Sequence, residues 1–450
     1  MSQQPERGDT GLAGLDCAPG ETLLSVRDLR TYYESGDLIG GQPVKAVDGV
    51  SFDVKKGETI GVVGESGCGK TTLGRTLVRL EAATGGEVRV GSDDVTELSG
   101  EDLKAWRRNA QVVFQDPESS LNDRMTIGEI IREPLDVHDW GTPAERRARV
   151  RDLLEKVGLQ EEHYYRYPHQ FSGGQRQRIG IARALALEPE FVVLDEPVSA
   201  LDVSVQAQIL NLLMDLQDEL GLTYLFIAHD LSVVRHICDR VAVMYLGNVM
   251  ELGPTDELFE DPANPYTRAL LSAVPEPDPT AEIDRMTLRG TPPSPRDPPE
   301  GCAFSTRCPV KIRPDGSDEV DESTWEAVEV FRETLRARSR TERSLSERAR
   351  ELIGLETRFA TVDEVVGELF TDRDIPVSVK EPVDQAADLA REGDEDAALE
   401  HLKGELGSVC DHESPEDHAV GTEGRESRCH RHAAEYEEPS AVGPSVGGED

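Results

Sequence analysis

The sequence predicts an α/β protein organised around one phosphate-binding loop. Three stretches, Thr59–Val63, Phe191–Leu194 and Leu222–Ala228, are β-prone and too apolar to face water, and helical patterns lie between them. Alternation of this kind predicts a buried parallel sheet covered by helices. A glycine-rich loop, Gly64–Thr72, follows the first of these strands, and the helical segment Thr72–Val78 follows the loop.

The loop Gly64-Glu65-Ser66-Gly67-Cys68-Gly69-Lys70-Thr71-Thr72 fits the pattern G-x-x-x-x-G-K-[ST]. Glycines allow successive backbone N–H groups to curl around phosphate oxygens, and the helix N-terminus adds a partial positive charge. Lys70 is expected to reach the β- and γ-phosphates, and the Thr71 hydroxyl to ligate Mg²⁺. A chance glycine-rich turn is the alternative. The upstream strand, the lysine and the threonine favour an ATP and Mg²⁺ site.

The composition is strongly acidic, with a formal charge of -40 from 88 acidic and 48 basic residues. Only 9 of the basic residues are lysine, and we interpret this surface as an adaptation to high salt, of the kind expected in a haloarchaeon. An ordinary acidic protein with one acidic tail is the alternative. A broad nucleic-acid-binding face needs net basic surface, so we expect no nucleic-acid partner.

The segment Met1–Glu21 lacks the apolar core of a secretory signal, and no apolar run of about 18 residues predicts a membrane span. A cytosolic chain is therefore expected. The odd count of seven cysteines argues against a disulfide framework in that compartment.

Two adjacent carboxylates, Asp195 and Glu196, follow the apolar strand Phe191–Leu194. The carboxyl ends of parallel strands form the crevice where α/β sheets bind ligands. We expect Asp195 to hold Mg²⁺ through its water shell and Glu196 to polarise the attacking water. The alternative is an ordinary exposed strand end.

A second anion-binding loop is predicted where Phe171 is followed by Ser172, Gly173, Gly174 and Gln175 at the start of a helix. Free N–H groups, a hydroxyl and the helix dipole would together attract a phosphate. No second lysine accompanies this loop, so it makes sense if it closes on a nucleotide held by another subunit. A plain helix N-cap is the alternative.

Six motifs in this order and spacing resemble the nucleotide-binding subunit of an ATP-binding-cassette (ABC) transporter, over about Leu23 to Cys308. The resemblance implies a P-loop NTPase domain of the ABC type, with a RecA-like core, an antiparallel β subdomain and a helical subdomain. It assigns further residues by motif: Gln115 to the Q-loop, Ser199-Ala200-Leu201-Asp202 to the D-loop, His229 to the switch histidine, and Tyr33, with Tyr32 as the fallback, to adenine stacking.

The resemblance also implies how the residues act. Two such domains meet head to tail, and each ATP lies between the Lys70 loop of one and Ser172-Gly173-Gly174 of the other. Gln115 would touch Mg²⁺ and the permease, and His229 would hold the γ-phosphate and the attacking water. Glu196, His229 and Gln115 are thus the predicted catalytic residues, and Asp202 a predicted nucleotide contact.

Four segments follow from these motifs and from composition. They are a disordered leader at 1–21, an ABC ATPase domain at 22–262 with a helical subdomain at about 116–186, a C-terminal extension at 263–314, and an acidic tail at 315–450. The tail holds 37 acidic and 15 basic residues. Helical patterns at Trp325–Leu335 and Ala386–Leu406 predict partial folding, and disorder is expected from about Asp411.

The chain is similar, within this family, to the ATPases of oligopeptide/dipeptide importers. The segments Gln115–Asn122, Pro265–Leu271 and Gly301–Pro309 carry that likeness. The transported solute stays open, since similar ATPase subunits serve peptide, nickel and sugar importers. The implied partners are two permease subunits, an extracellular solute-binding protein and a second ATPase subunit, identical or different, at the cytoplasmic face of the membrane.

Some members of that group carry an iron–sulfur cluster on four C-terminal cysteines. Here Cys302, Cys308, Cys410 and Cys429 could form such a four-thiolate site for a [4Fe–4S] cluster. The C-x5-C spacing is loose, and an acidic insertion separates Cys308 from Cys410. The alternative is four reduced, partly buried thiols.

Two other functions compete with an importer ATPase that converts ATP and water to ADP and phosphate. One is a soluble ATPase of the same fold, acting in translation or DNA repair. Such chains usually have two cassettes or long coiled-coil insertions and basic surface, none of which is seen here. The other gives the main role to the acidic C-terminal part, as an interaction or salt-adaptation module.

Overall fold

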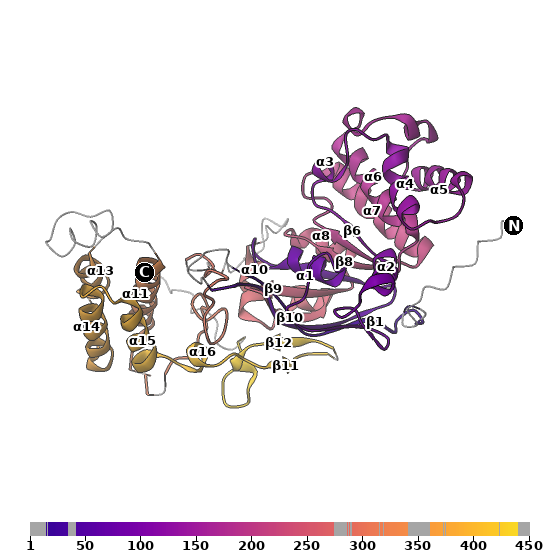
Figure 1. Ribbon diagram of the computed structural model, residues 1–450. Helices are drawn as coiled ribbons and strands as arrows, with labels where there is room; N and C mark the ends of the chain where they lie inside the picture. The colour runs from indigo at the N-terminus through magenta and orange to yellow at the C-terminus, as the bar shows by residue number, and fades with distance from the viewer. Residues whose placement is uncertain are drawn as a thin grey trace. The chain divides into compact units, whose positions relative to one another are not determined.

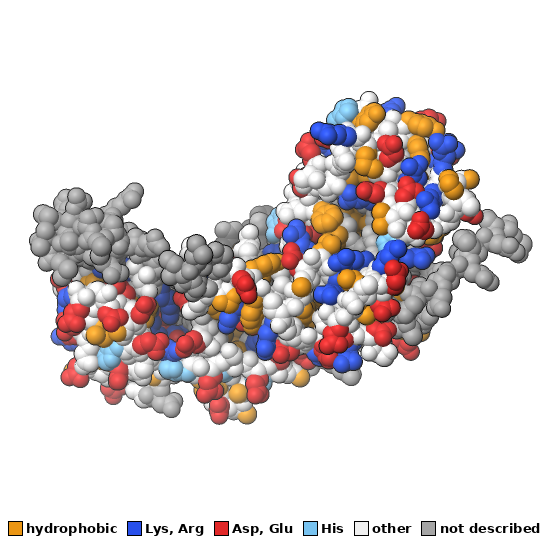
Figure 2. All heavy atoms as spheres, in the orientation of Figure 1, with side chains coloured by type: hydrophobic (Ala, Val, Ile, Leu, Met, Phe, Trp, Pro, Cys, Tyr) orange, Lys and Arg blue, Asp and Glu red, His pale blue; other side chains and the backbone are white. Residues whose placement is uncertain are grey.

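A computed structural model describes residues 15, 17–34, 42–273, 286, 288, 290–314, 316–317, 319–340, 361–371, 373, 375–422 and 424–439. The chain divides into two compact units. The first unit comprises residues 1–285, 294–297 and 419–428, and the second comprises residues 286–293, 298–418 and 429–450. None of the described helices is both long enough and apolar enough to cross a bilayer. Acidic side chains are interspersed with basic and apolar ones over the visible surface (Figure 2).

The first unit begins with an antiparallel sheet of four strands in the order β2-β1-β4-β5. Alternate side chains of β1, among them Leu24 and Val26, are completely buried, as a strand with one face on the core requires. This sheet is the antiparallel subdomain that the sequence predicted. Its strands are β1 (Thr22–Tyr33), β2 (Val44–Lys55), β4 (Gly85–Val90) and β5 (Asp93–Asp94).

A larger, mainly parallel sheet forms the centre of the first unit, with the strand order β12-β10-β9-β3-β8-β7-β6. Every residue of β3, β7 and β8 is buried, which explains why these strands are continuous apolar runs. The strands are β3 (Thr59–Val63), β6 (Ala110–Val113), β7 (Phe191–Asp195), β8 (Thr223–Ile227), β9 (Arg240–Tyr245), β10 (Asn248–Pro254) and β12 (Glu426–Arg428).

Because β3, β7 and β8 run parallel and adjacent, their carboxyl ends meet at one edge of the sheet. The phosphate loop follows β3, the carboxylate pair ends β7, and His229 follows β8. The predicted site residues are therefore brought to the same edge by the strand order.

Helices of the first unit pack on this sheet or gather into a separate layer. Figure 1 shows α3, α4, α5 and α6 together, away from the antiparallel sheet, as the predicted helical subdomain. The helices are α1 (Lys70–Leu77), α2 (Gly100–Asn109), α3 (Pro117–Ser120), α4 (Ile127–Val137), α5 (Pro143–Lys156), α6 (Gly173–Ala184), α7 (Val203–Leu220), α8 (Leu231–Ile237), α9 (Thr255–Glu260) and α10 (Pro265–Ser272), with 3-10 turns η2 (Glu161–Tyr165), η3 (Pro168–Gln170) and η4 (Leu185–Leu187).

The second unit is mainly helical and has its own apolar core, to which Trp325, Phe331 and Phe370 belong. Buried ion pairs join Lys311 to Glu329 and to Asp411, each at 2.8 Å. Its elements are α11 (Glu322–Arg340), α13 (Val362–Phe370), α14 (Val377–Arg391), α15 (Glu395–Leu406), α16 (Val409–His412) and η5 (His430–His432); β11 (Asp417–Ala419) ends at the boundary with residues 419–428. The predicted helix over Ala386–Leu406 is in fact two helices, α14 and α15, that meet at a turn around Gly393.

Two predictions of disorder are wrong where the structure describes the chain. From Asp411 onward, residues 411–422 and 424–439 include α16, β11, β12 and η5, and β12 pairs with β10. In the leader, Leu15 is 1 % exposed in the core of the first unit, and its carbonyl accepts from Lys56 Nζ at 2.8 Å. In both segments the residues that make these contacts are isolated in the sequence, so no hydrophobic periodicity predicted that they would be ordered. Residues 1–14, 16 and 440–450 lie outside the described residues.

Candidate functional site

The phosphate loop connects β3 to α1 and depends on its glycines for close packing. Gly64 and Gly69 have φ values of 149° and 106°. A Cβ at Gly64 would lie 2.0 Å from the Met244 carbonyl oxygen, and one at Gly69 would lie 1.8 Å from the Ala46 carbonyl oxygen. Larger residues are therefore excluded at both positions by neighbouring backbone, in addition to the left-handed conformation. The loop therefore packs closely on the backbone of β2 and β9.

Lys70 is the first residue of α1, and its side chain folds back over the loop. Its Nζ donates to the carbonyl oxygens of Gly64 at 2.9 Å and Glu65 at 3.1 Å, and the side chain is buried. These carbonyls hold the ammonium group above the loop. A phosphate placed on the loop would meet a cation already in position.

Thr71 and Asp195 place two oxygen groups at the junction of α1 and β7. Thr71 Oγ1 donates to Asp195 Oδ1 at 3.0 Å, and Asp195 is 3 % exposed. Burial raises the pKa of Asp195, while the hydrogen bond from Thr71 and the charge of Arg75 oppose that rise. A hydroxyl beside a buried carboxylate is the donor set that Mg²⁺ prefers, so these residues fit the cation that the sequence predicted.

Glu196 lies directly after β7 in a left-handed conformation, with φ at 46°. Its Oε2 accepts from Gln115 Nε2 at 3.0 Å and lies 2.9 Å from His229 Nδ1. The His229 side chain is 58 % exposed and that of Glu196 only 16 %. The three residues predicted to be catalytic therefore meet at one carboxylate oxygen, although they lie far apart in the sequence.

The Ser172 loop forms a self-contained cap at the start of α6. Gln175 N–H donates to Ser172 Oγ at 3.4 Å, and Ser172 N–H donates to Gln175 Oε1 at 3.1 Å. This is a capping box, the alternative that the sequence left open. A Cβ at Gly174 would lie 2.4 Å from Val205 Cγ1, so close packing on α7 requires that glycine. Ser172 itself remains exposed.

Asp202 acts as the N-cap of α7 and is also exposed. Its Oδ1 accepts from Ser204 Oγ at 2.6 Å and from Val205 N–H at 3.0 Å. These hydrogen bonds, with that from Ser204 the strongest, lower the pKa of Asp202. Within the described part of the chain, no hydrogen bond or ion pair joins Asp202 or Ser172 to the Lys70 loop, so within one chain these two residues stand apart from it.

The two candidate aromatic residues at the end of β1 differ in their surroundings. The Tyr32 hydroxyl donates to Asp48, and burial together with this bond raises the pKa of Tyr32 to about 12. Tyr33 is 37 % exposed, and its hydroxyl lies 3.4 Å from Thr72 Oγ1. Tyr33 is therefore the more exposed of the two rings and lies beside the phosphate loop.

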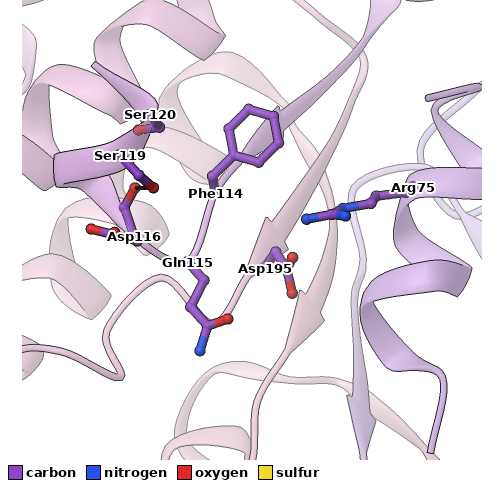
Figure 3. Close-up of a pocket in the computed structure, with 7 residues that line it drawn as sticks. All are labelled: Arg75, Phe114, Gln115, Asp116, Ser119, Ser120 and Asp195. Carbon is purple, nitrogen blue, oxygen red and sulfur yellow. Dashed lines mark hydrogen bonds between the residues drawn. The ribbon is translucent and has the colours of Figure 1, made fainter. Parts of the chain in front are cut away.

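A cavity of about 430 Å³ lies beside Asp195 and opens toward the helical layer. Figure 3 shows Arg75 reaching toward Asp195 from α1, with Gln115 and Phe114 following β6 on the other side. Asp116, Ser119 and Ser120 complete the lining. Of these residues the sequence analysis assigned roles only to Gln115 and Asp195. The position of Arg75, one turn after Thr71 on the same helix, was the signal available for a further site residue.

The four C-terminal cysteines gather within the second unit. Cys302 N–H donates to the Cys410 carbonyl oxygen at 2.9 Å. Burial raises the pKa of Cys302 to about 12 and that of Cys429 to about 11, and the neighbouring thiols add to the rise. Burial also raises the pKa of Cys308, and the nearby thiols of Cys429, Cys302 and Cys410 raise it further. Over the described ranges, however, no group of three or more Cys, His, Asp or Glu has an arrangement that could hold a metal ion.

Comparisons with known proteins agree with this geometry. A family profile described as ABC transporter matches residues 47–199, and one described as the oligopeptide/dipeptide transporter C-terminal region matches residues 250–313. A third, described as a domain of unknown function (DUF8228), matches residues 322–423.

Among curated proteins, the chain is 55 % identical over 302 residues to the oligopeptide transport ATP-binding protein AppF of Bacillus subtilis. The matched region covers 66 % of this chain and 92 % of AppF. It is 54 % identical over 288 residues to the dipeptide transport ATP-binding protein DppF of Haemophilus influenzae, covering 64 % and 88 % of the two chains. The solved ATP-binding cassette MJ0796, bound to ADP and Pi, is 31 % identical with a TM-score of 0.47, covering 52 % of this chain and 98 % of that one.

Proposed function

This chain belongs to the ABC transporter family, among the ATP-binding subunits of oligopeptide/dipeptide importers, and we propose that its Lys70 loop binds the ATP whose hydrolysis drives uptake. The observation that supports this most directly is the meeting of Lys70, Thr71, Asp195 and Glu196 at one edge of the sheet. Each of these groups has a defined part in phosphoryl transfer.

The phosphates of ATP would replace the loop carbonyls as partners of Lys70. Phosphate oxygens are charged and accept stronger hydrogen bonds from an ammonium group than carbonyl oxygens do. The amides of Gly64, Ser66, Gly67, Gly69, Thr71 and Thr72 would form the surrounding cradle, and Tyr33 would stack on adenine. The Glu65 amide, which donates to the Tyr266 hydroxyl at 3.0 Å, and the Cys68 amide, which donates to the Glu65 carbonyl at 3.2 Å, would shape the loop. Thr71 and Asp195, with Gln115, would hold Mg²⁺, which neutralises charge on the β- and γ-phosphates.

Glu196 would act as the general base. It takes a proton from a water molecule, the water oxygen bonds to the γ-phosphorus, and the bond to the β–γ bridging oxygen breaks to give ADP and phosphate. Gln115 and His229 already touch the Glu196 carboxylate at 3.0 and 2.9 Å. These contacts would orient the base, and the exposed His229 side chain would reach the γ-phosphate.

A second chain would complete the site. Family membership implies association of two ATPase subunits, and we propose that Ser172, Gly173, Gly174 and Gln175, with Asp202, face the ATP of the partner. Ser172 and Asp202 are exposed and capped only by their own helices, which supports a surface role. An identical and a different partner cassette would fit equally well, since both would receive the same loop.

The cavity beside Asp195 is our candidate for the permease contact. It lies between the helical layer and the nucleotide edge, and Gln115 belongs to both the cavity and the Glu196 cluster. A permease segment seated against Arg75 and Asp116 would therefore sense nucleotide through Gln115. By this proposal the chain is peripheral, held at the cytoplasmic face by two permease subunits, with an extracellular protein delivering oligopeptides or dipeptides.

We propose, as a separate point, that Cys302, Cys308, Cys410 and Cys429 bind a [4Fe–4S] cluster. Their support is the gathering of four largely buried thiols from distant parts of the chain. Their thiols do not yet form a ligand set, so cluster binding would require local rearrangement. Iron and acid-labile sulfide in anaerobically purified protein, lost in Cys308→Ser, would support the cluster, and absence of both would leave four reduced thiols.

Hydrolysis measured on purified chain in high-salt buffer tests the main proposal. We expect Mg²⁺-dependent release of phosphate from ATP, and none after addition of a Mg²⁺ chelator. Copurification of permease subunits after co-expression would support the importer role. If the folded chain neither hydrolysed ATP nor bound a permease, the proposed function would be wrong.

A further inference from the structure

A segment from the far end of the chain is built into the first unit. Residues 419–428 belong to this unit, although residues 298–418, which belong to the second unit, separate them in the sequence from its other parts. Their strand β12 pairs antiparallel with β10, with Ser427 opposite Glu251 and Glu426 opposite Leu252. We call residues 419–428 the return segment.

A buried ion pair fixes the return segment to β10. Arg425 Nη2 lies 2.9 Å from Glu251 Oε1, and the two side chains are only 5 % and 0 % exposed. The same carboxylate accepts from the backbone N–H groups of Ala263 at 3.0 Å and Asn264 at 2.9 Å. Glu251 therefore ties the return segment to the residues that precede α10.

Asn264 continues this set of contacts. Its Nδ2 donates to the Arg428 carbonyl oxygen at 3.1 Å and to Ser427 Oγ at 3.3 Å. Its Oδ1 accepts from Tyr266 N–H at 2.9 Å and so caps the start of α10. One buried amide thus touches the return segment with one end and positions Tyr266 with the other.

Tyr266 carries the contacts into the phosphate loop. Its hydroxyl oxygen accepts from the backbone N–H of Glu65 at 3.0 Å, and its ring packs on Tyr245 with centroids 4.7 Å apart. The side chain is completely buried. Burial also raises the pKa of Tyr266, so the hydroxyl stays neutral at physiological pH. The second loop residue is consequently held by a side chain from the transporter-type C-terminal region.

We propose that Tyr266 is a positioning residue for the phosphate loop, and that the return segment holds it in place through Arg425, Glu251 and Asn264. The loop must present several N–H groups in one curved arrangement, and its cost of ordering falls if Glu65 is fixed beforehand. This proposal rests on the phosphate-binding role of the Lys70 loop. It gives the end of the inserted domain a direct mechanical connection to nucleotide binding.

The first test compares two tyrosine-to-phenylalanine variants of the full chain. Tyr266→Phe removes the acceptor of Glu65 N–H and keeps the ring. Tyr224→Phe is the matched control. Tyr224 lies on β8, and its buried hydroxyl donates to the Leu213 carbonyl of α7 at 3.1 Å, away from the phosphate loop. We expect Tyr266→Phe to raise the Kd for ADP and the KM for ATP about two- to tenfold, with kcat at saturating ATP unchanged.

Tyr224→Phe is expected to lower the unfolding temperature but to leave Kd and KM unchanged. A wild-type Kd for ADP in Tyr266→Phe, or an equal rise in both variants, would overturn the positioning role. Lys70→Ala separates this outcome from a failure of the proposed function, because ADP affinity unchanged in Lys70→Ala would instead remove the loop as the nucleotide site.

The second test asks whether the return segment acts through Tyr266. Arg425→Gln should raise the Kd for ADP, and the double variant with Tyr266→Phe should bind ADP no more weakly than Tyr266→Phe within about twofold. Thr422→Val is the control, since the hydroxyl of this exposed residue of the same segment donates to Glu257 of α9 at 2.7 Å, and the substitution keeps the Thr422 carbonyl that accepts from Arg425 N–H. Multiplicative effects of Arg425→Gln and Tyr266→Phe would exclude the return segment from the proposal.

Discussion

The Lys70 loop and the Ser172 loop both begin helices, yet the chain treats them differently. Lys70 is buried, bonded to two carbonyls of its own loop, and followed by Thr71, which bonds to Asp195. Ser172 is exposed, and its hydroxyl and N–H exchange hydrogen bonds with Gln175 in the first turn of the helix that it begins. One loop is assembled within the chain, and the other is presented at its surface.

This difference indicates how a single chain can fold stably even if its nucleotide site needs a second chain. A capping box satisfies two N–H groups at the start of α6, those of Ser172 and Gln175, so the Ser172 loop keeps its form without a nucleotide. The Lys70 loop instead brings together a cation, a hydroxyl and two carboxylates. The four predictions below test whether the two loops serve one reaction from two chains, beginning with the largest expected effect.

Glu196→Gln should lower the hydrolysis rate at least about 100-fold, because the amide cannot take the proton of water. ATP binding should persist, since the Lys70 loop is untouched. Phosphate release and equilibrium binding of ATP measure the two quantities. Near wild-type turnover would remove Glu196 from its proposed role; Glu118→Gln, at an exposed ion pair with Arg176, is the control for loss of a carboxylate.

Lys70→Ala should weaken ATP binding about 10- to 100-fold, the loss of charge-assisted hydrogen bonds to phosphate. Isothermal titration with ATP and ADP measures it. Lys156→Ala is the control, because Lys156 of α5 forms an ion pair with Glu219 of α7, outside the Lys70 loop. Tight ATP binding by Lys70→Ala would contradict the phosphate contact.

Ser172→Ala should reduce turnover about tenfold or more while the Kd of one chain for ADP stays unchanged. Both this variant and Thr142→Ala lose a capping-box hydroxyl, so both should lose about 1 kcal/mol of stability. Thr142, at the start of α5, should leave turnover unchanged. Equal turnover in the two variants would make Ser172 a plain cap.

Asp195→Asn should raise the unfolding temperature of nucleotide-free chain at pH 7 by a few degrees. Burial raises the pKa of Asp195 above the ordinary value of an aspartate, so the folded state binds its proton more tightly than the unfolded state. Stability from this group is therefore present at low pH and lost as pH rises through the raised pKa. The amide stays neutral and avoids that loss.

Calorimetry of both forms between pH 4 and pH 8 checks this prediction. The gain from Asp195→Asn should shrink toward the acid end of that range, because a raised pKa lets the folded carboxyl take up its proton at a higher pH than the unfolded one. An equal or lower unfolding temperature for Asp195→Asn at pH 7 would show that the ionised carboxylate does not destabilise the nucleotide-free chain.

Much of the ATPase unit was predictable because its signals are local. Continuous apolar runs gave β3, β7 and β8, and the glycine-lysine pattern gave the loop between β3 and α1. The family resemblance then supplied Gln115 and His229, which the strand order brings to Glu196. For these residues, motif and topology agree.

The contacts that the sequence did not reveal join residues far apart in the chain. Tyr266 lies 201 positions from its partner Glu65, and Arg425 lies 174 positions from Glu251. Neither pair has a periodic or motif signal, and the acidic composition after Asp411 favoured disorder. The buried ion pairs of Lys311 are equally non-local. Such partners become visible only when the fold places them together.

The mass of the Glu196→Gln chain in the presence of ATP tests most directly whether the two loops meet across two chains. Light scattering should report a two-cassette complex with ATP and Mg²⁺, alone or with the second ATPase subunit of the importer, and single cassettes with ADP. The added substitution Ser172→Arg should abolish that complex. Single cassettes under every one of these conditions would contradict the account.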